Sequence, residues 1–207
     1  LIGLAQAARI EGRAADGRGH LVEALAIADR IGDHARTALA AYRLGQVTPD
    51  VDAAGVLFER AAVAARAAGN RNLAGVALHS HGDVLFDRGR YEESLGLLLR
   101  AAAEFEAAQA LNDLGTVYNS IGRIYRAHGR LDEALRYQKS ALELHPKHGD
   151  PFSLLQSLNA VSVVYQRMSD FESGRAYLEE ALAVSASLPA TRAAARAQDF
   201  LRGNMAG

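Results

Sequence analysis

The chain has 207 residues, of which 49% are hydrophobic and 23% charged, a composition typical of a folded globular protein rather than a disordered one. Its 23 basic and 24 acidic residues give a net charge of -1, so the whole chain has no electrostatic preference for nucleic acid or an anionic membrane. It has no cysteine, which excludes disulfides and thiolate metal sites and fits a reducing cytoplasm, where we expect the protein to reside.

Neither a membrane span nor a secretion signal is predicted. No apolar run reaches the roughly 18 to 20 residues that a membrane helix needs, and no signal-peptide pattern opens the chain. The chain begins at Leu1, inside a helical pattern and without an initiator methionine. We therefore expect an excerpt of a longer protein.

The helical patterns, taken in chain order, predict five helical hairpins and a final amphipathic helix. The clearest hairpin has an apolar helix face up to Tyr125, a turn at 128–130 and a second apolar face that stops at Pro146. The expected hairpins cover residues 1–32, 33–69, 70–109, 110–150 and 151–190, and a capping helix covers 191–203.

Two boundaries in this series are unusual. The second hairpin is three residues short, which we assign to its inter-helix turn, with Thr48 as the N-cap and Pro49 at the first helical position. The junction at 111–113 contains neither glycine nor proline, so its helix end has no sequence signal.

Small residues recur through the hairpins at a nearly fixed spacing. In the second helices they lie 37, 40, 40 and 40 residues apart, at Ala24, Ala61, Ala101, Ala141 and Ala181. Bulky residues precede them by three positions, at Leu21, Phe58, Leu98, Gln138 and Leu178, and only Gln138 is polar. The first helices carry small residues at Ala5, Gly45, Gly82, Gly122 and Ser162. This series predicts a repeat array in which small residues admit a neighbouring helix closely.

The same positions resemble a known repeat. The chain is similar to the tetratricopeptide repeat family in a 40-residue form, like that of bacterial multidomain regulators, at Ile121, Gly122, Tyr125, Ala134, Ala141 and Pro146. HEAT and armadillo arrays have a similar period but do not explain the glycine and tyrosine spacing. The resemblance implies a single all-α domain, a right-handed superhelical solenoid whose first helices line a concave face.

That face gives the candidate binding residues. They lie on the first helices, beside the face that carries the small residues, and by helical geometry they form one face of their own. These residues are Tyr42, Gln46, His79, Asp83, Phe86, Asn119, Arg123, Arg126, Asn159, Gln166 and Arg167. We expect this groove to bind an extended peptide or a partner helix.

Two interpretations of these residues stay open. Asn119 and Asn159, one period apart, resemble an asparagine ladder that holds a peptide backbone, but they could equally hydrogen-bond neighbouring helices. The three arginines either form salt bridges between repeats or grip a peptide carboxylate.

Signals for catalysis, metals and cofactors are weak. The seven histidines form no HExxH motif, and the chain has no phosphate-binding loop and no GxSxG motif. His79 and His81 point to different helix faces, and His145 and His148 are expected in a solvated loop. We therefore predict no enzyme activity, no metal and no cofactor.

The function predicted from the sequence is a protein-interaction scaffold, the regulatory part of a larger bacterial protein. An alternative is a small-molecule-sensing domain of a signalling or transcription regulator. That function would need a cluster of aromatic residues on the groove, and the candidate residues include just two, Tyr42 and Phe86. A third is self-association into a homo-oligomer through an apolar second-helix face. Contact with nucleic acid or membrane is not expected.

Overall fold

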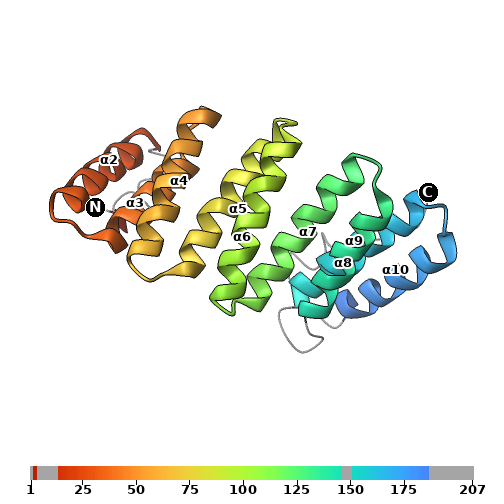
Figure 1. Ribbon diagram of the computed structural model, residues 1–207. Helices are drawn as coiled ribbons and strands as arrows, with labels where there is room; N and C mark the ends of the chain where they lie inside the picture. Colours follow the sequence, from red (N-terminus) through yellow and green to blue (C-terminus); the bar gives the residue numbers. More distant parts are fainter. Residues whose placement is uncertain (1, 4–13, 146–150, 187–207) are drawn as a thin grey trace. The chain divides into compact units, whose positions relative to one another are not determined.

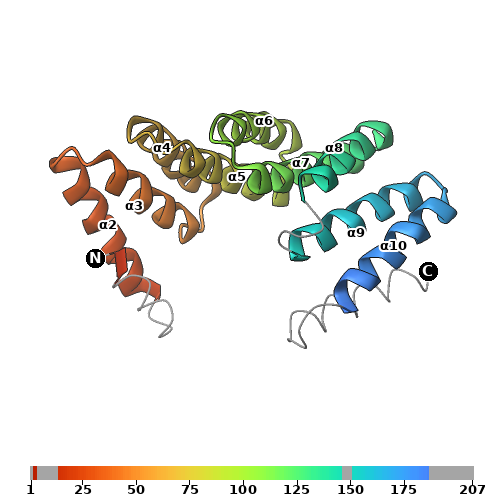
Figure 2. The same cartoon turned by 90° about the horizontal axis from the view of Figure 1, so that it is seen from below.

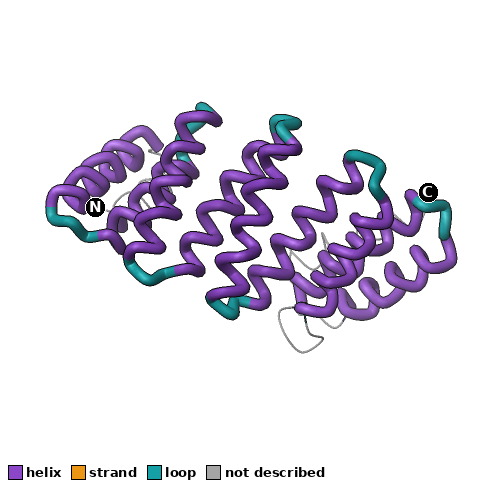
Figure 3. The backbone as a smooth tube through the Cα atoms, viewed as in Figure 1, coloured by secondary structure: helices purple, strands orange, loops and turns teal. Residues whose placement is uncertain are grey.

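The computed structural model describes residues 2–3, 14–145 and 151–186. Within these ranges the chain forms α-helices joined by short loops, and no described residue lies in a β-strand (Figure 3). The helices, labelled in Figure 1, are α2 (Ala14–Arg30), α3 (His34–Gln46), α4 (Val51–Ala67), α5 (Arg71–Asp87), α6 (Tyr91–Ala107), α7 (Leu111–Ala127), α8 (Leu131–Leu144), α9 (Pro151–Arg167) and α10 (Phe171–Ala186). The expected capping helix at 191–203 lies outside the described residues.

The helices group into two compact units, Leu1–Ala110 and Leu111–Gly207. In the first unit α3 pairs with α4 and α5 with α6, and α2 packs on α3. Figure 2 shows α3 and α5 in one layer of this unit and α4 and α6 in a second layer. In the second unit α7 pairs with α8, α9 pairs with α10, and α7 contacts α9. Stacked hairpins confirm the predicted class, an all-α helical repeat solenoid; the right-handed superhelix stays a prediction.

Helix ends are marked by single residues in the left-handed backbone region. In the described part of the chain these are Gly32, Gly69, Gly89, Gln109, Gly129 and Ser169, with φ between 53° and 74°. Around Gly89, for example, the Gly89 N–H donates to the Phe86 carbonyl at 2.9 Å and the Arg90 N–H donates to the Leu85 carbonyl at 3.0 Å. This pair of bonds is the Schellman motif. Gln109 adopts this motif without glycine, which explains why no glycine or proline marks the helix end before α7.

The turn of the second hairpin differs from the prediction. Helix α3 has 13 residues where α5 has 17, while the loop at 47–50 is longer than the one at 88–90. The three missing residues are therefore lost from the helix and not from the turn. Asp50, not Thr48, is the N-cap, because its side chain accepts from the Ala53 N–H at 2.8 Å. The Thr48 hydroxyl instead donates to the Leu44 carbonyl at 2.7 Å.

The predicted small and bulky positions meet in the core. A Cβ on Gly45 would lie 2.9 Å from Phe58, one on Gly82 would lie 3.0 Å from Leu98, and one on Gly122 would lie 2.6 Å from Gln138. These bulky residues are at most 1% exposed. The first and second helices of a hairpin therefore approach too closely for any side chain at the glycine.

Candidate functional site

The predicted groove residues lie on first helices, as expected, but they fall into both units. Helices α3 and α5 of the first unit carry Tyr42, Gln46, His79, Asp83 and Phe86. Helices α7 and α9 of the second unit carry Asn119, Arg123, Arg126, Asn159, Gln166 and Arg167.

In the first unit the candidate side chains contact their own neighbours. Gln46 Nε2 donates to the Tyr42 hydroxyl at 2.9 Å, and Arg43 donates to Gln46 Oε1 at 3.2 Å. His79 Nε2 lies 3.3 Å from Asp83 Oδ2 on the next helical turn. Such local contacts hold each polar group along its own helix, at exposed or partly exposed positions.

In the second unit Asn119 belongs to a chain of hydrogen bonds. Its Nδ2 donates to Ser157 Oγ on α9 at 2.8 Å, and Ser157 Oγ lies 2.7 Å from His145 Nδ1. His145 Nε2 donates a hydrogen bond to the Asn112 carbonyl at 3.0 Å. Because a neutral imidazole carries one N–H, Nδ1 then accepts a hydrogen bond from the Ser157 hydroxyl. The amide nitrogen of Asn119 thus connects α7 to α9, as the structural interpretation of the asparagines proposes.

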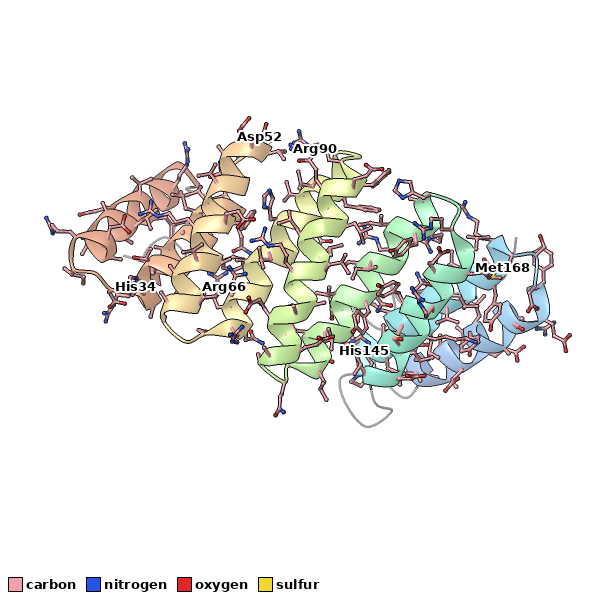
Figure 4. All side chains as sticks on the ribbon, viewed as in Figure 1. His34, Asp52, Arg66, Arg90, His145 and Met168 are labelled. Atoms are coloured by element: carbon pink, nitrogen blue, oxygen red, sulfur yellow. The ribbon has the colours of Figure 1, made fainter. Side chains whose placement is uncertain are left out.

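His145 corrects one prediction. It was expected in a solvated loop, but it is the C-cap residue of α8 and only 2% exposed. Figure 4 labels it at the lower end of this helix. Its position 40 residues after the buried Phe105 is a periodic signal of burial that the loop prediction overlooked. His148 lies outside the described residues.

Three arginines gather on α7 and α9. Arg126 is half-buried, and burial lowers its pKa, as do the nearby charges of Arg167 and then Arg123. Within the described residues neither Arg126 nor Arg167 has an ion-pair partner. A half-buried cation without a counter-ion is destabilising, and a carboxylate placed there would relieve this. We call Arg123, Arg126 and Arg167 the arginine cluster.

Other candidate chemistry is limited in the part of the chain that the structure describes. No group of three or more His, Cys, Asp and Glu side chains there could hold a metal ion. Among the helices of the described ranges, none has both the length and the hydrophobicity of a membrane span.

Comparison with known families identifies the repeat. Two family models, both described as tetratricopeptide repeat, match residues 73–147 and 154–188, which together make up more than half of the chain. The chain belongs to the tetratricopeptide repeat family. Tetratricopeptide arrays are in general scaffolds for protein binding and not enzymes, and stacked repeats present extended binding surfaces.

Solved structures show the same fold. BtubC (BKLC) from P. vanneervenii has a TM-score of 0.72 and 21% identity, over 91% of this chain and 81% of that one. RapI in its apo form has a TM-score of 0.77 and 15% identity, over 95% of this chain and 57% of that one. MamA from Desulfovibrio magneticus RS-1 has a TM-score of 0.65 and 16% identity, over 91% and 94%. None of the curated proteins matches this chain.

Proposed function

We propose that this tetratricopeptide array is a protein-interaction scaffold that binds an extended acidic segment of a partner through the arginine cluster. The observation that carries the proposal is the half-buried Arg126, which has two further arginines beside it and no acidic partner among the described residues. A carboxylate can accept two parallel hydrogen bonds from one guanidinium, which gives orientation as well as affinity.

The location of the arginine cluster also supports a peptide ligand. The cluster lies on α7 and α9, two first helices that contact one another, so an extended chain crossing them meets side chains of both. Asn159 and Gln166 on α9 are partly exposed and offer amide groups for a peptide backbone. We expect an affinity in the micromolar range, about -8 kcal/mol.

The test uses an array of extended peptides arranged in pairs. One member of each pair is rich in Asp and Glu, and the other member has Asn and Gln at the same positions. Wild type should retain the acidic member of each pair only, and Arg126→Gln with Arg167→Gln should weaken binding at least about tenfold, since a hydrogen bond to a charged group contributes about 1.5–3 kcal/mol. The matched control, Arg136→Gln with Arg175→Gln, removes the same charge from α8 and α10 and should leave binding unchanged.

Two outcomes would contradict the proposal. Equal retention of the acidic and amide peptides would mean that the arginines do not select carboxylates. Equal weakening by the control variant would mean that the effect comes from net charge alone. The small-molecule alternative predicts that free glutarate competes with the acidic peptides at peptide-like concentrations, so this competition separates the two functions.

A further inference from the structure

A cleft lies in the first unit, and none of the predicted groove residues lines it. It is a cleft of about 740 Å³ with walls on α4 and α6 and a floor on α5. Its apolar lining comes from Gly55 and Val56 on α4, Leu85 on α5, and Gly96 and Leu97 on α6, and His81 joins them from α5. No predicted site residue lines it.

Ion pairs lie at both ends of this cleft. At one end Arg90 donates to Asp52 at 2.6 Å and to Glu93 at 2.7 Å, and Figure 4 shows Arg90 beside Asp52. At the other end Arg100 donates to both oxygens of Glu59, at 2.6 and 2.9 Å. Asp52 and Glu59 are seven residues apart, about 10 Å along α4. The cleft is therefore short, and its charged side chains are paired with one another.

The repeat pattern shows how the cleft arises. Six residues before the small residue of the second helix, α6 and α8 carry Leu95 and Leu135, whereas α4 carries Gly55. Immediately before the small residue of the first helix, α7 and α9 carry Ile121 and Val161, whereas α5 carries His81. Between α4 and α5 a glycine and an imidazole thus occupy the positions where α6 and α7, and likewise α8 and α9, carry two aliphatic residues.

These two changes depend on each other. A Cβ on Gly55 would lie 2.5 Å from His81 Nε2, so only glycine leaves room for the ring. The other ring nitrogen, Nδ1, is buried and has no hydrogen-bond partner in the described part of the chain. An unpaired buried nitrogen is unfavourable for the free protein, and an aliphatic side chain at this position would avoid it.

The imidazole is uncharged near neutral pH. Burial is the main cause that lowers its pKa, and the charges of Arg90 and Arg100 act in the same direction, while Glu59 and Glu93 oppose them. A neutral imidazole offers one hydrogen-bond donor and one acceptor. The cleft therefore combines an apolar lining, charged walls whose groups are paired with one another and one neutral polar ring.

We infer that this cleft is a binding site for a compact, uncharged ring compound that carries one N–H or O–H group and hydrogen-bonds to His81. Each charged side chain of the walls already has an ion-pair partner, so none is left to bind a charged ligand. The ion pairs at the two ends limit the length of the occupant, and the volume lies in the range of small-molecule sites. The site goes beyond the proposed peptide binding and does not depend on it, because its residues lie in the other unit.

Backbone amide NMR of the whole chain tests this inference, with indole as the probe and 1-methylindole as its match without a donor. Indole should shift the Gly55 and Gly96 amide signals saturably, with a dissociation constant in the millimolar range or below. Loss of the donor in 1-methylindole should weaken binding about fivefold, the effect of one hydrogen bond.

Two variants should fill the cleft and keep the fold. Gly55→Leu with His81→Ile restores the pair that other repeats carry, and Gly96→Leu fills it from the opposite wall, where a Cβ meets nothing within 4 Å. Each should weaken indole at least tenfold, while Val63→Ala on exposed α4 surface should not. Unsaturable shifts in wild type, or equal binding by both filled variants, overturn the inference. Shifts of these signals with protein concentration alone would overturn it in favour of a second copy as occupant.

Discussion

Hairpins α5–α6 and α7–α8 place glycines at the same positions but put side chains of different polarity against them. Gly75 in α5 faces Phe105, and Gly115, one period later in α7, faces His145. Phe105 and His145 are 1% and 2% exposed, so both are core residues. The imidazole is accepted because Ser157 and the Asn112 carbonyl meet its nitrogens.

The second pair of positions has no such compensation. Gly82 faces Leu98, and Gly122 faces Gln138, which is fully buried. Both amide atoms of Gln138 lack hydrogen-bond partners within the described residues. The glycines therefore set the separation of the two helices, whereas the polarity of the side chain opposite each glycine varies and determines local stability.

The largest effect should come from filling a glycine contact. Gly122→Leu would place a Cβ 2.6 Å from Gln138 Cγ, and we expect the free energy of unfolding to fall by about 3 kcal/mol or more through overpacking. Gly96→Leu is the matched control: its Cβ has open space, and it should stabilise by up to about 1 kcal/mol through helix propensity. Urea unfolding of both variants measures this, and similar effects of the two would refute the close contact.

Making the two hairpins alike should raise stability. Gln138→Leu removes an unpaired buried amide and supplies the residue found at Leu98 and Leu178, so we expect a gain of about 2 kcal/mol in chemical denaturation. The reverse change, Leu98→Gln, should destabilise the first unit. A loss of stability in Gln138→Leu would show that the amide has a partner, such as a buried water.

The Gly55 and His81 pair should produce a pH dependence specific to the first unit. Because the pKa of His81 is lowered in the folded chain, the unfolded chain binds the proton more readily. Stability should be full above pH 6.5, the ordinary value, and should fall as the pH drops from there towards the folded-state pKa. The slope has a limit of about 1.4 kcal/mol per pH unit, and solvent reaching the half-exposed ring reduces it.

Gly55→Leu with His81→Ile should flatten the slope of stability against pH. Protonation of carboxylates also reduces stability, but it does so only at a lower pH. Arg100 lowers the pKa of Glu59 from its ordinary 4.5, so that pair contributes stability above this pH and loses it only as the pH falls further. Thermal unfolding of wild type and the double variant between about pH 7 and 5 separates the two. An unchanged slope would assign the effect to another histidine.

The smallest effect concerns the loop before α7. Gln109 has φ of 53°, where the equivalent Gly89 and Gly129 have 74° and 72°. Gln109→Gly should stabilise by about 0.5–1 kcal/mol, because relief of the left-handed strain exceeds the extra entropy of the unfolded chain. Gly89→Ala should destabilise by a similar amount. Denaturation midpoints measure both, and a destabilised Gln109→Gly would contradict the strain.

Much of the fold was predictable because its determinants are local. Helix periodicity and turn residues predicted the hairpin order and the turn at 128–130, and the 40-residue spacing predicted that Gly82 and Gly122 would admit a neighbouring helix closely. The structure adds that the side chains facing them are Leu98 and Gln138. The prediction at Thr48 was wrong, since threonine, proline and aspartate can each begin a helix and the competing Asp50 cap was favoured. The peptide role of the groove residues stays a prediction.

By itself the sequence determined that this chain is an all-α repeat array, because apolar and small residues recur with helical spacing and at a nearly fixed period. The glycine and tyrosine spacing of the first helices gave the resemblance to the tetratricopeptide family. Only the tertiary structure decided how its polar groups are used. Whether His145 is buried and paired, whether Gln138 is buried and unpaired, and whether Arg126 has a counter-ion depend on side chains that lie on other helices. Burial and hydrogen bonding arise from neighbours in space, and the period of a repeat does not specify them.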